Sequence, residues 1–435
     1  MPRLACLFLA ITLLAACSET PPADAMNGIA KRYVHLVLAT GEIAPGYVDA
    51  YYGPPEWRET VRNEAADREA VLERAQALRE ELKAVPMPYG GMPALRRVYL
   101  DKQLDALIAY LEILGGKELT FDAEAQALYD VSPPHFDAAH FDAILAEIDA
   151  LVPGEGSLAE RVENFRQQFV IPGDALPAVF EAAIEECRTR TLMHIPMPVQ
   201  ESFRVEYVND KPWSGYNWFQ GDAHSLIQVN TDLPIFIDRA VELGCHEGYP
   251  GHHVYNALLE SELVDQRGWM EFSVYPLFSP PSLIAEGSAN YGVELAFPGD
   301  ERLAFERDVL APLAGIDADM LDEYAALREK LAELDYAGNE AARAYLDGEM
   351  NRDEAIDWLV KYNLYSPERA AQRVDFIETY RSYVINYNLG RDLVRDYVER
   401  NAESHEGRWQ VFAELLGSPR LPSGLQAPQD VKGGT

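Results

Sequence analysis

The sequence predicts a mostly α-helical protein with a small β-sheet. Apolar residues recur every three or four positions along much of the 435-residue chain, which is the period of an amphipathic helix. Strand-like patterns are short and occur mainly at 203–208 and 226–230. Between them, 212–218 is rich in aromatic residues, which either line a cleft or cap the core. Helices therefore dominate, and we expect the sheet to be small.

Several helices have recognisable ends and faces. Trp57–Val85 is a polar amphipathic stretch, and Ala94–Leu114 has apolar residues at helical spacing before a stop at Gly115. Ser157 and Glu160 fit a capping box that opens another helix. A later stripe predicts one buried helix face and consists of Met320, Tyr324, Leu327, Leu331 and Leu334. Because Met193–Pro198 interrupts the helices, we expect an N-terminal helical lobe at 28–192 and a second lobe at 193–417.

The charge balance argues against nucleic acid as a partner. Lys and Arg number 37 and Asp and Glu number 71, so the formal net charge is −34. Such a field would repel a phosphate backbone. It either attracts basic peptides or forms a solvated acidic face that keeps an exported protein soluble.

The N-terminus predicts export and lipid anchoring. Arg3 precedes an apolar run, Leu4–Ala16, which is too short to span a membrane and leads into Cys17. This pattern is typical of a lipoprotein signal peptide at 1–16, with acyl chains on Cys17 as the membrane anchor. Ordinary secretion with a chance cysteine is the alternative. We expect a periplasmic protein on the outer membrane, with a tether at 17–27 and a flexible tail at 418–435.

Two further cysteines, Cys187 and Cys245, could pair in an oxidising compartment. Their spacing matches no cysteine signature, and we favour the interpretation that both are buried small hydrophobic residues.

The segment His246-Glu247-Gly248-Tyr249-Pro250-Gly251-His252 carries the clearest chemical signal. Two histidines four residues apart on a helix bind zinc, and the Glu after the first is the general base. Here the spacing is six, so an unbroken helix would turn His252 about 240° away from His246. A bulge between Gly248 and Gly251 would return His252 to the metal. The alternative is a helix that ends at Gly248, followed by a turn and two solvent-facing histidines.

A third ligand would complete the site. Glu286 lies on a second predicted helix and could form a His2Glu zinc site with one open position. Glu294, two turns further on, could orient a ligand through a hydrogen bond. Alternatively, Glu286 is a carboxylate near a helix N-terminus, where the dipole favours it.

These motifs resemble a known family. The pattern His-Glu-x-x-Pro-Gly-His followed by Glu-Gly-x-Ala-x-Tyr-x-x-Glu is similar to domain-of-unknown-function family 885, regarded as gluzincin-like bacterial metallopeptidases. Asn230-Thr231, Gly348–Ala355 and Tyr387-Asn-Leu-Gly390 also fit, so the resemblance covers about 226–393. Ser288 departs from it, standing where the family usually has Trp. Arg381–Tyr383 departs as well, standing where Pro-Gly-Gln is usual.

The resemblance implies a helical zincin-like fold with a deep cleft, zinc ligands His246, His252 and Glu286, and Glu247 as base. One Zn2+ per chain is expected, although other divalent metals suit these ligands. His253, one helical step from His252, should point elsewhere.

We therefore expect a zinc-dependent peptidase that acts on short peptides. Tyr387 is the first candidate donor to the oxyanion, with Tyr383 and His224 behind it. We expect Ser225–Asn230 to be an edge strand that pairs with a substrate backbone, which assigns Asn230 to substrate binding. The alternatives are a zinc hydrolase of another amide or ester and a non-catalytic lipoprotein binding module.

Overall fold

The computed structural model describes residues 22–211 and 213–426. Cys17 and the predicted signal peptide lie outside these residues, as does 427–435 of the predicted tail. The helices that precede the main sheet are α1 (Pro22–Ile43), α2 (Pro55–Glu64), α3 (Arg68–Ala84), α4 (Gly91–Leu114), α5 (Phe121–Tyr129), α6 (Ala138–Leu151), α7 (Leu158–Arg166), the 3-10 helix η1 (Gln167–Phe169) and α8 (Leu176–Leu192).

The strands are β1 (Val48–Tyr51), β2 (Ser202–Val208), β3 (Gly215–Gly221), β4 (His224–Asn230) and β5 (Val274–Pro276). The later helices are α9 (Ile237–Leu243), the π-helix η2 (Gly244–Gly248), α10 (His252–Leu258), the π-helix η3 (Leu259–Asp265), the 3-10 helix η4 (Met270–Ser273), α11 (Pro280–Ala296), α12 (Glu301–Phe305), the π-helix η5 (Glu306–Leu310), α13 (Ala311–Ala314), the 3-10 helix η6 (Ala318–Met320), α14 (Leu321–Ala332), α15 (Asp335–Leu346), α16 (Arg352–Tyr362), α17 (Pro367–Tyr380), the 3-10 helix η7 (Arg381–Val384), α18 (Ile385–Asn401), α19 (His405–Leu416) and α20 (Pro422–Leu425). The prediction of a mostly helical protein with small sheets is confirmed.

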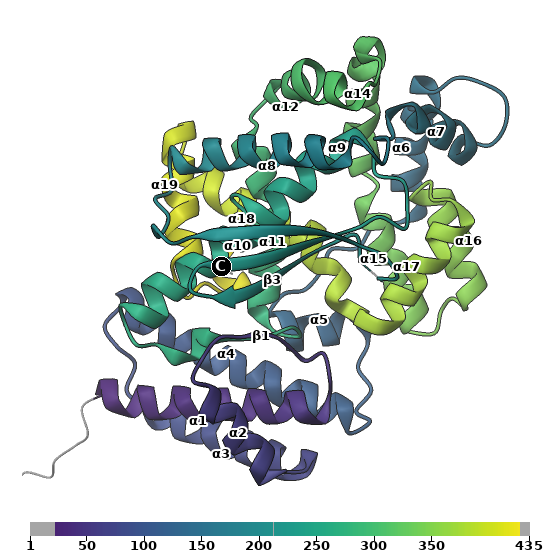
Figure 1. Cartoon of the computed structure of the whole chain (residues 1–435). Helices are drawn as coiled ribbons and strands as arrows, with labels where there is room; N and C mark the ends of the chain where they lie inside the picture. The colour runs from purple at the N-terminus through teal and green to yellow at the C-terminus, as the bar shows by residue number, and fades with distance from the viewer. Residues whose placement is uncertain (1–21, 212, 427–435) are drawn as a thin grey trace, which may run out of the picture.

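The first four helices pack together on one side of the main sheet, and α8 lies on the other side (Figure 1). The stretch predicted at 57–85 forms two helices, because Ala65 adopts a left-handed conformation after α2 and Asp67 caps α3. As predicted, α4 ends at Leu114, where the Gly115 amide donates to the helix carbonyls. The capping box at Ser157 is also present.

The main sheet has the order β2-β4-β3, with β2 parallel and β3 antiparallel to β4. The strands predicted at 203–208 and 226–230 are therefore confirmed. The prediction that Ser225–Asn230 is an edge strand is wrong, because β4 lies in the centre and both its edges are paired. The aromatic loop continues into β3 from Gly215 onward. A second sheet pairs β1 with β5, just before α11.

Residue 193 does not separate two packing units. One core joins Phe141, Ile148 and Val162 to Leu327 and Tyr362. The largest core combines α8 with the helices that follow the sheet. Segments on either side of the predicted lobe boundary bury their apolar faces against each other, so the two lobes are interleaved. Of the predicted stripe, Tyr324 and Leu327 on α14 and Leu334 just before α15 are buried, whereas Leu331 is half-buried and Met320, on η6, is exposed.

Three smaller expectations change. Residues 22–27 of the predicted tether belong to α1, and residues 418–426 of the predicted tail pack against the core through Leu421 and Leu425. Cys187 and Cys245 form a disulfide between α8 and η2, so the interpretation of two unpaired residues is wrong. None of the helices described between residues 22 and 426 has the length and hydropathy needed to cross a membrane.

Candidate metal centre

The helix that carries the histidine motif is interrupted. After α9 the chain widens into the π-helix η2, bends at Tyr249–Gly251, and begins α10 at His252. Gly251 is required at this bend, because a β-carbon there would lie 1.8 Å from the carbonyl oxygen of His246. The predicted break is present, and it starts earlier than expected because η2 already departs from α-helical spacing. The helix does end at Gly248, as the alternative interpretation expected, but its two solvent-facing histidines are wrong, because His253 is buried and His252 contacts Glu286.

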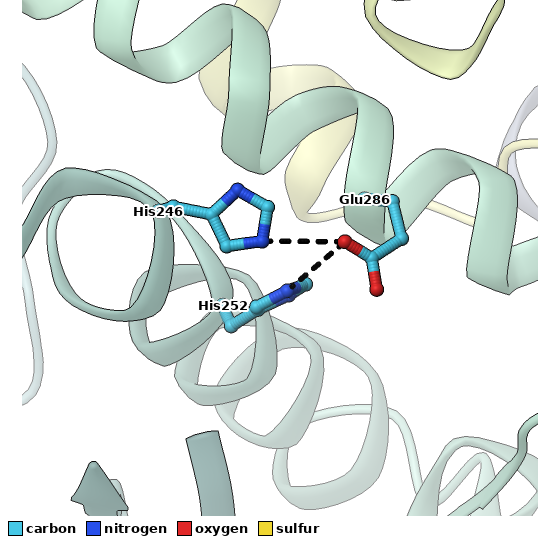
Figure 2. Close-up of side chains that lie close together, drawn as sticks. All are labelled: His246, His252 and Glu286. Carbon is cyan, nitrogen blue, oxygen red and sulfur yellow. Dashed lines mark ion pairs between the residues drawn. The ribbon is translucent and has the colours of Figure 1, made fainter. Parts of the chain in front are cut away.

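His246, His252 and Glu286 converge (Figure 2). The His246 Nε2 atom lies 3.2 Å from Glu286 Oε2, and the His252 Nε2 atom lies 3.6 Å from the same oxygen. The two imidazole rings are nearly perpendicular, with centroids 4.6 Å apart. One donor atom from each residue lies within 4.8 Å of the other two. Two helical segments, η2–α10 and α11, thus bring together a His2Glu donor set.

The hydrogen bonds of His246 fix which nitrogen faces this cluster. Asn290 donates from Nδ2 to the carbonyl oxygen of Tyr387, so its Oδ1 accepts from His246 Nδ1–H at 2.9 Å. A neutral His246 then presents the lone pair of Nε2 toward Glu286. A lone pair and a carboxylate oxygen at 3.2 Å repel each other unless a proton or a cation lies between them. Without an ion the proton is favoured, because the hydrogen bond to Glu286 raises the pKa of His246 to about 9 against the effect of burial; a bound cation would take the place of that proton.

The carboxylate of Glu286 is oriented in the same way. The Tyr383 hydroxyl donates to Oε1 at 2.8 Å, whereas Oε2 is buried and has no hydrogen-bond partner among the described residues. A buried carboxylate oxygen without a partner is costly unless an ion satisfies it. With imidazole nitrogens beside it, this oxygen offers the mixed N and O donor set that Zn2+ accepts.

Close helix packing explains the glycines around Glu286 and Tyr387. A β-carbon at Gly287 of α11 would lie 2.3 Å from the carbonyl carbon of Gly390 on α18. One at Gly390 would lie 2.6 Å from the carbonyl oxygen of Leu283. Gly292 leaves room for the ring of Pro250. The glycines therefore let α11 approach both α18 and the bend before α10, which places Glu286 opposite the histidines.

Glu247 lies beside the cluster and is almost fully buried. Its side chain packs against β3, where a β-carbon at Gly215 would approach Glu247 Oε1 to 2.8 Å. The side chain of Asn217 donates to the Glu247 carbonyl oxygen at 2.6 Å and fixes its backbone. Burial raises the pKa of the Glu247 carboxyl, while the nearby imidazoles act in the opposite direction. A carboxylate with a raised pKa suits proton transfer near neutral pH.

Two of the predicted site residues have other contacts. Glu294 is exposed, because its eight-residue separation from Glu286 along the α-helix turns its side chain about 80° away from the cluster. Its Oε1 atom lies 3.9 Å from Nε of Arg391. Asn290, only four residues on, is the side chain that orients His246. The amide of Asn230 donates to the carbonyl oxygens of Lys211 and Trp213, and its Oδ1 accepts from the Asp232 amide. It holds the loop before β3, so its amide is engaged within the protein.

The two other histidines near the motif also lie apart from the cluster. His253 points away, as predicted, and contacts Ser225 and Glu201. His224 contacts Ser202.

Tyr387 lies between the site and an aromatic group on α17. Burial raises its pKa well above the usual value, and the charges of Glu286 and Glu247 act in the same direction. The oxyanion role of Tyr387 stays a prediction. Tyr383, the second candidate, donates instead to Glu286.

Sequence reasoning missed Asn290, Asn217 and Gly215. The position of Asn290, one helical turn after Glu286, is a signal that could have found it. For Asn217 and Gly215 the sequence offers no such signal, because their contact with Glu247 depends on how β3 packs. The predicted deep cleft stays a prediction, since the two surface hollows found lie elsewhere, one beside His135 and His140 and the other beside Lys102 and Asp130.

Comparisons with known proteins give distant similarities in structure. No family model matches the sequence, and no curated protein matches it. A provisionally assigned lipoprotein from Colwellia psychrerythraea has 13% identity and a TM-score of 0.48, and the match covers 82% of this chain and 71% of that one. Metallocarboxypeptidase 1 of Trypanosoma cruzi has 12% identity and a TM-score of 0.32, covering 92% and 90%. Both TM-scores lie below 0.5, so neither similarity decides the function.

Proposed function

We propose that this protein is a zinc-dependent peptidase that hydrolyses short peptides in the periplasm, anchored through acylated Cys17. One observation carries the enzymatic part of the proposal. His246 and His252 converge on Oε2 of Glu286, a buried oxygen that has no hydrogen-bond partner among the described residues, directly beside Glu247. These groups supply a cation site and a base in one place.

The roles of the residues follow from their contacts. A zinc ion held by the three ligands would supply Lewis-acid activation of a water molecule and of the scissile carbonyl. Glu247 takes a proton from the water and passes it to the leaving amine, and its raised pKa makes the carboxylate a stronger base for the first of these two transfers. Asn290 and Tyr383 hold His246 and Glu286 in place. Tyr387 donates from its hydroxyl to the developing oxyanion.

The test compares the zinc-supplied wild type with Glu247→Gln on a peptide library and on a matched panel of esters. We expect peptide cleavage by the wild type and a fall of about 1,000-fold or more in the variant, because the proton transfer is lost. Zinc content should be unchanged. Glu294→Gln is the control, since it removes a carboxylate from the same helix as Glu286 but at the surface.

Cleavage of esters alone would indicate a different hydrolase. Absence of turnover on both panels would favour the binding module. Full peptide turnover by Glu247→Gln would remove Glu247 from the mechanism.

A further inference from the structure

The N-terminal region contributes a carboxylate, Asp49, to the neighbourhood of the metal centre. Asp49 lies on β1, which pairs with β5 immediately before α11. Val48 is opposite Pro276 and Ala50 is opposite Tyr275, so Asp49 is the extra residue of a β-bulge. Bulges redirect a side chain and occur often beside active sites. The strand pairing therefore places an acidic side chain next to the helix that carries Glu286.

Tyr216 of β3 holds this carboxylate. Its hydroxyl donates to Asp49 Oδ1 at 3.0 Å, and its ring stacks on Trp213 with a centroid distance of 5.5 Å. Tyr216 directly follows Gly215, whose missing side chain leaves room for Glu247. One short segment of β3 thus contacts both Asp49 and the proposed catalytic base.

The charge of Asp49 has no Lys or Arg partner in the part of the chain that the structure describes, residues 22–211 and 213–426. Burial raises the pKa of its carboxyl to about 6; the hydrogen bond from Tyr216 and the charge of His252 act in the opposite direction, and the charges of Glu286 and Glu247 add to the rise. At pH 7 the group is still largely ionised. Asp49 thus adds a negative charge beside the metal centre, and no Lys or Arg of the described residues offsets it.

We propose that Asp49, oriented by Tyr216, binds a positively charged group of the substrate. An ammonium or guanidinium group would be the counter-ion of the Asp49 carboxylate and would donate a charge-assisted hydrogen bond to it. This inference rests on the proposed peptidase function and names the substrate class that it accepts. The cation is either the free α-amino group of a peptide or a basic side chain.

The test uses two matched peptide pairs. Ala-Ala-Ala with a free or an acetylated N-terminus probes the α-amino group, and acetyl-Ala-Lys-Ala against acetyl-Ala-norleucine-Ala probes the side chain. Binding is measured by calorimetry on zinc-supplied Glu247→Gln protein, with and without Asp49→Asn, and hydrolysis is measured on the wild type. We expect the charged member of at least one pair to bind about tenfold or more tightly, and Asp49→Asn to abolish this preference.

Two control variants sharpen the result. Asp357→Asn removes the same charge from the exposed face of α16 and should keep the preference for the charged peptide. It therefore distinguishes direct contact with Asp49 from long-range attraction by the net negative charge of the protein. Tyr216→Phe keeps the charge but removes the hydroxyl that orients it, so it should reduce the preference less than Asp49→Asn. If Asp49→Asn fails to fold, Tyr216→Phe still tests whether Asp49 binds the cation.

No preference in either pair, or an equal preference in Asp49→Asn, would overturn the inference. If the wild type hydrolyses none of the peptides, the proposed peptidase function is contradicted. The calorimetry still decides whether Asp49 binds a cation.

Discussion

Single hydrogen bonds determine what this site can bind. Asn290 contacts Nδ1 of His246 and Tyr383 contacts Oε1 of Glu286, so that Nε2 of His246 and Oε2 of Glu286 face each other on the inner side. Outer contacts of this kind fix the tautomer and orientation of a ligand. The cluster therefore offers donor atoms of the kinds that bind a divalent cation.

A second set of buried contacts lies behind His252. Glu201 accepts hydrogen bonds from Arg188 at 2.6 Å, from His253 at 3.1 Å and from the hydroxyl of Tyr249. Burial alone would raise the pKa of Glu201, but these three hydrogen bonds outweigh it and lower the pKa to about 2. The ionised form of Glu201 is thus stabilised in the folded protein.

This shift predicts a pH dependence of stability. The folded pKa lies below the ordinary value of 4.5, so the contribution of Glu201 is fully present above pH 4.5 and is lost as the pH falls toward 2. We expect Glu201→Gln to lower the free energy of unfolding by about 2 kcal/mol at pH 7 and by progressively less below pH 4.5. Urea unfolding of both proteins from pH 7 to pH 3 measures the difference. A difference that stays constant over this range would contradict the assignment.

At the scale of elements, the crossing of α11 and α18 positions the third ligand. Gly287 and Gly390 meet with no space for a side chain on either helix. An added methyl group at Gly287 must push the helices apart and move Glu286 with them. Gly287 and Gly390 are therefore required for helix packing, in addition to being part of the sequence motifs.

Gly287→Ala tests this requirement. Overpacking should lower the free energy of unfolding by about 1 to 3 kcal/mol, measured by urea denaturation. Gly28→Ala is the matched control, because Gly28 is also helical but has open space around it, and there the change should stabilise by about 0.5 to 1 kcal/mol. Equal stability of Gly287→Ala and the wild type would show that the helices can separate without cost.

The elements differ in how far the sequence predicts them. α4, the capping box at Ser157 and β4 follow from periodicity and capping residues. β3 was not predicted, because Gly215, Asn217 and Gly221 have low strand propensity and the strand forms by pairing with β4. The sequence predicts the grouping of His246, His252 and Glu286 through its motifs. It gives no sign of Asp49, since only the pairing of β1 with β5 brings the N-terminal region to the site.

For the whole molecule, the net charge of −34 opposes compaction. Salt shortens the range of this repulsion from about 30 Å at 0.01 M to about 8 Å at 0.15 M. We expect the thermal midpoint to rise by about 2 °C or more when sodium chloride increases over this range at pH 7. A parallel series in potassium chloride separates screening from binding of a particular cation. A lower midpoint at 0.15 M would mean that attractive ion pairs outweigh the net repulsion.

If His246, His252 and Glu286 hold one metal ion, metal analysis of the purified protein should detect it. After zinc is supplied and excess is removed, we expect about one zinc per chain in the wild type and in His135→Ala, which alters an exposed histidine paired with Asp122. His252→Ala should lose the zinc. Full zinc retention in His252→Ala, or no zinc in the wild type, would contradict the account.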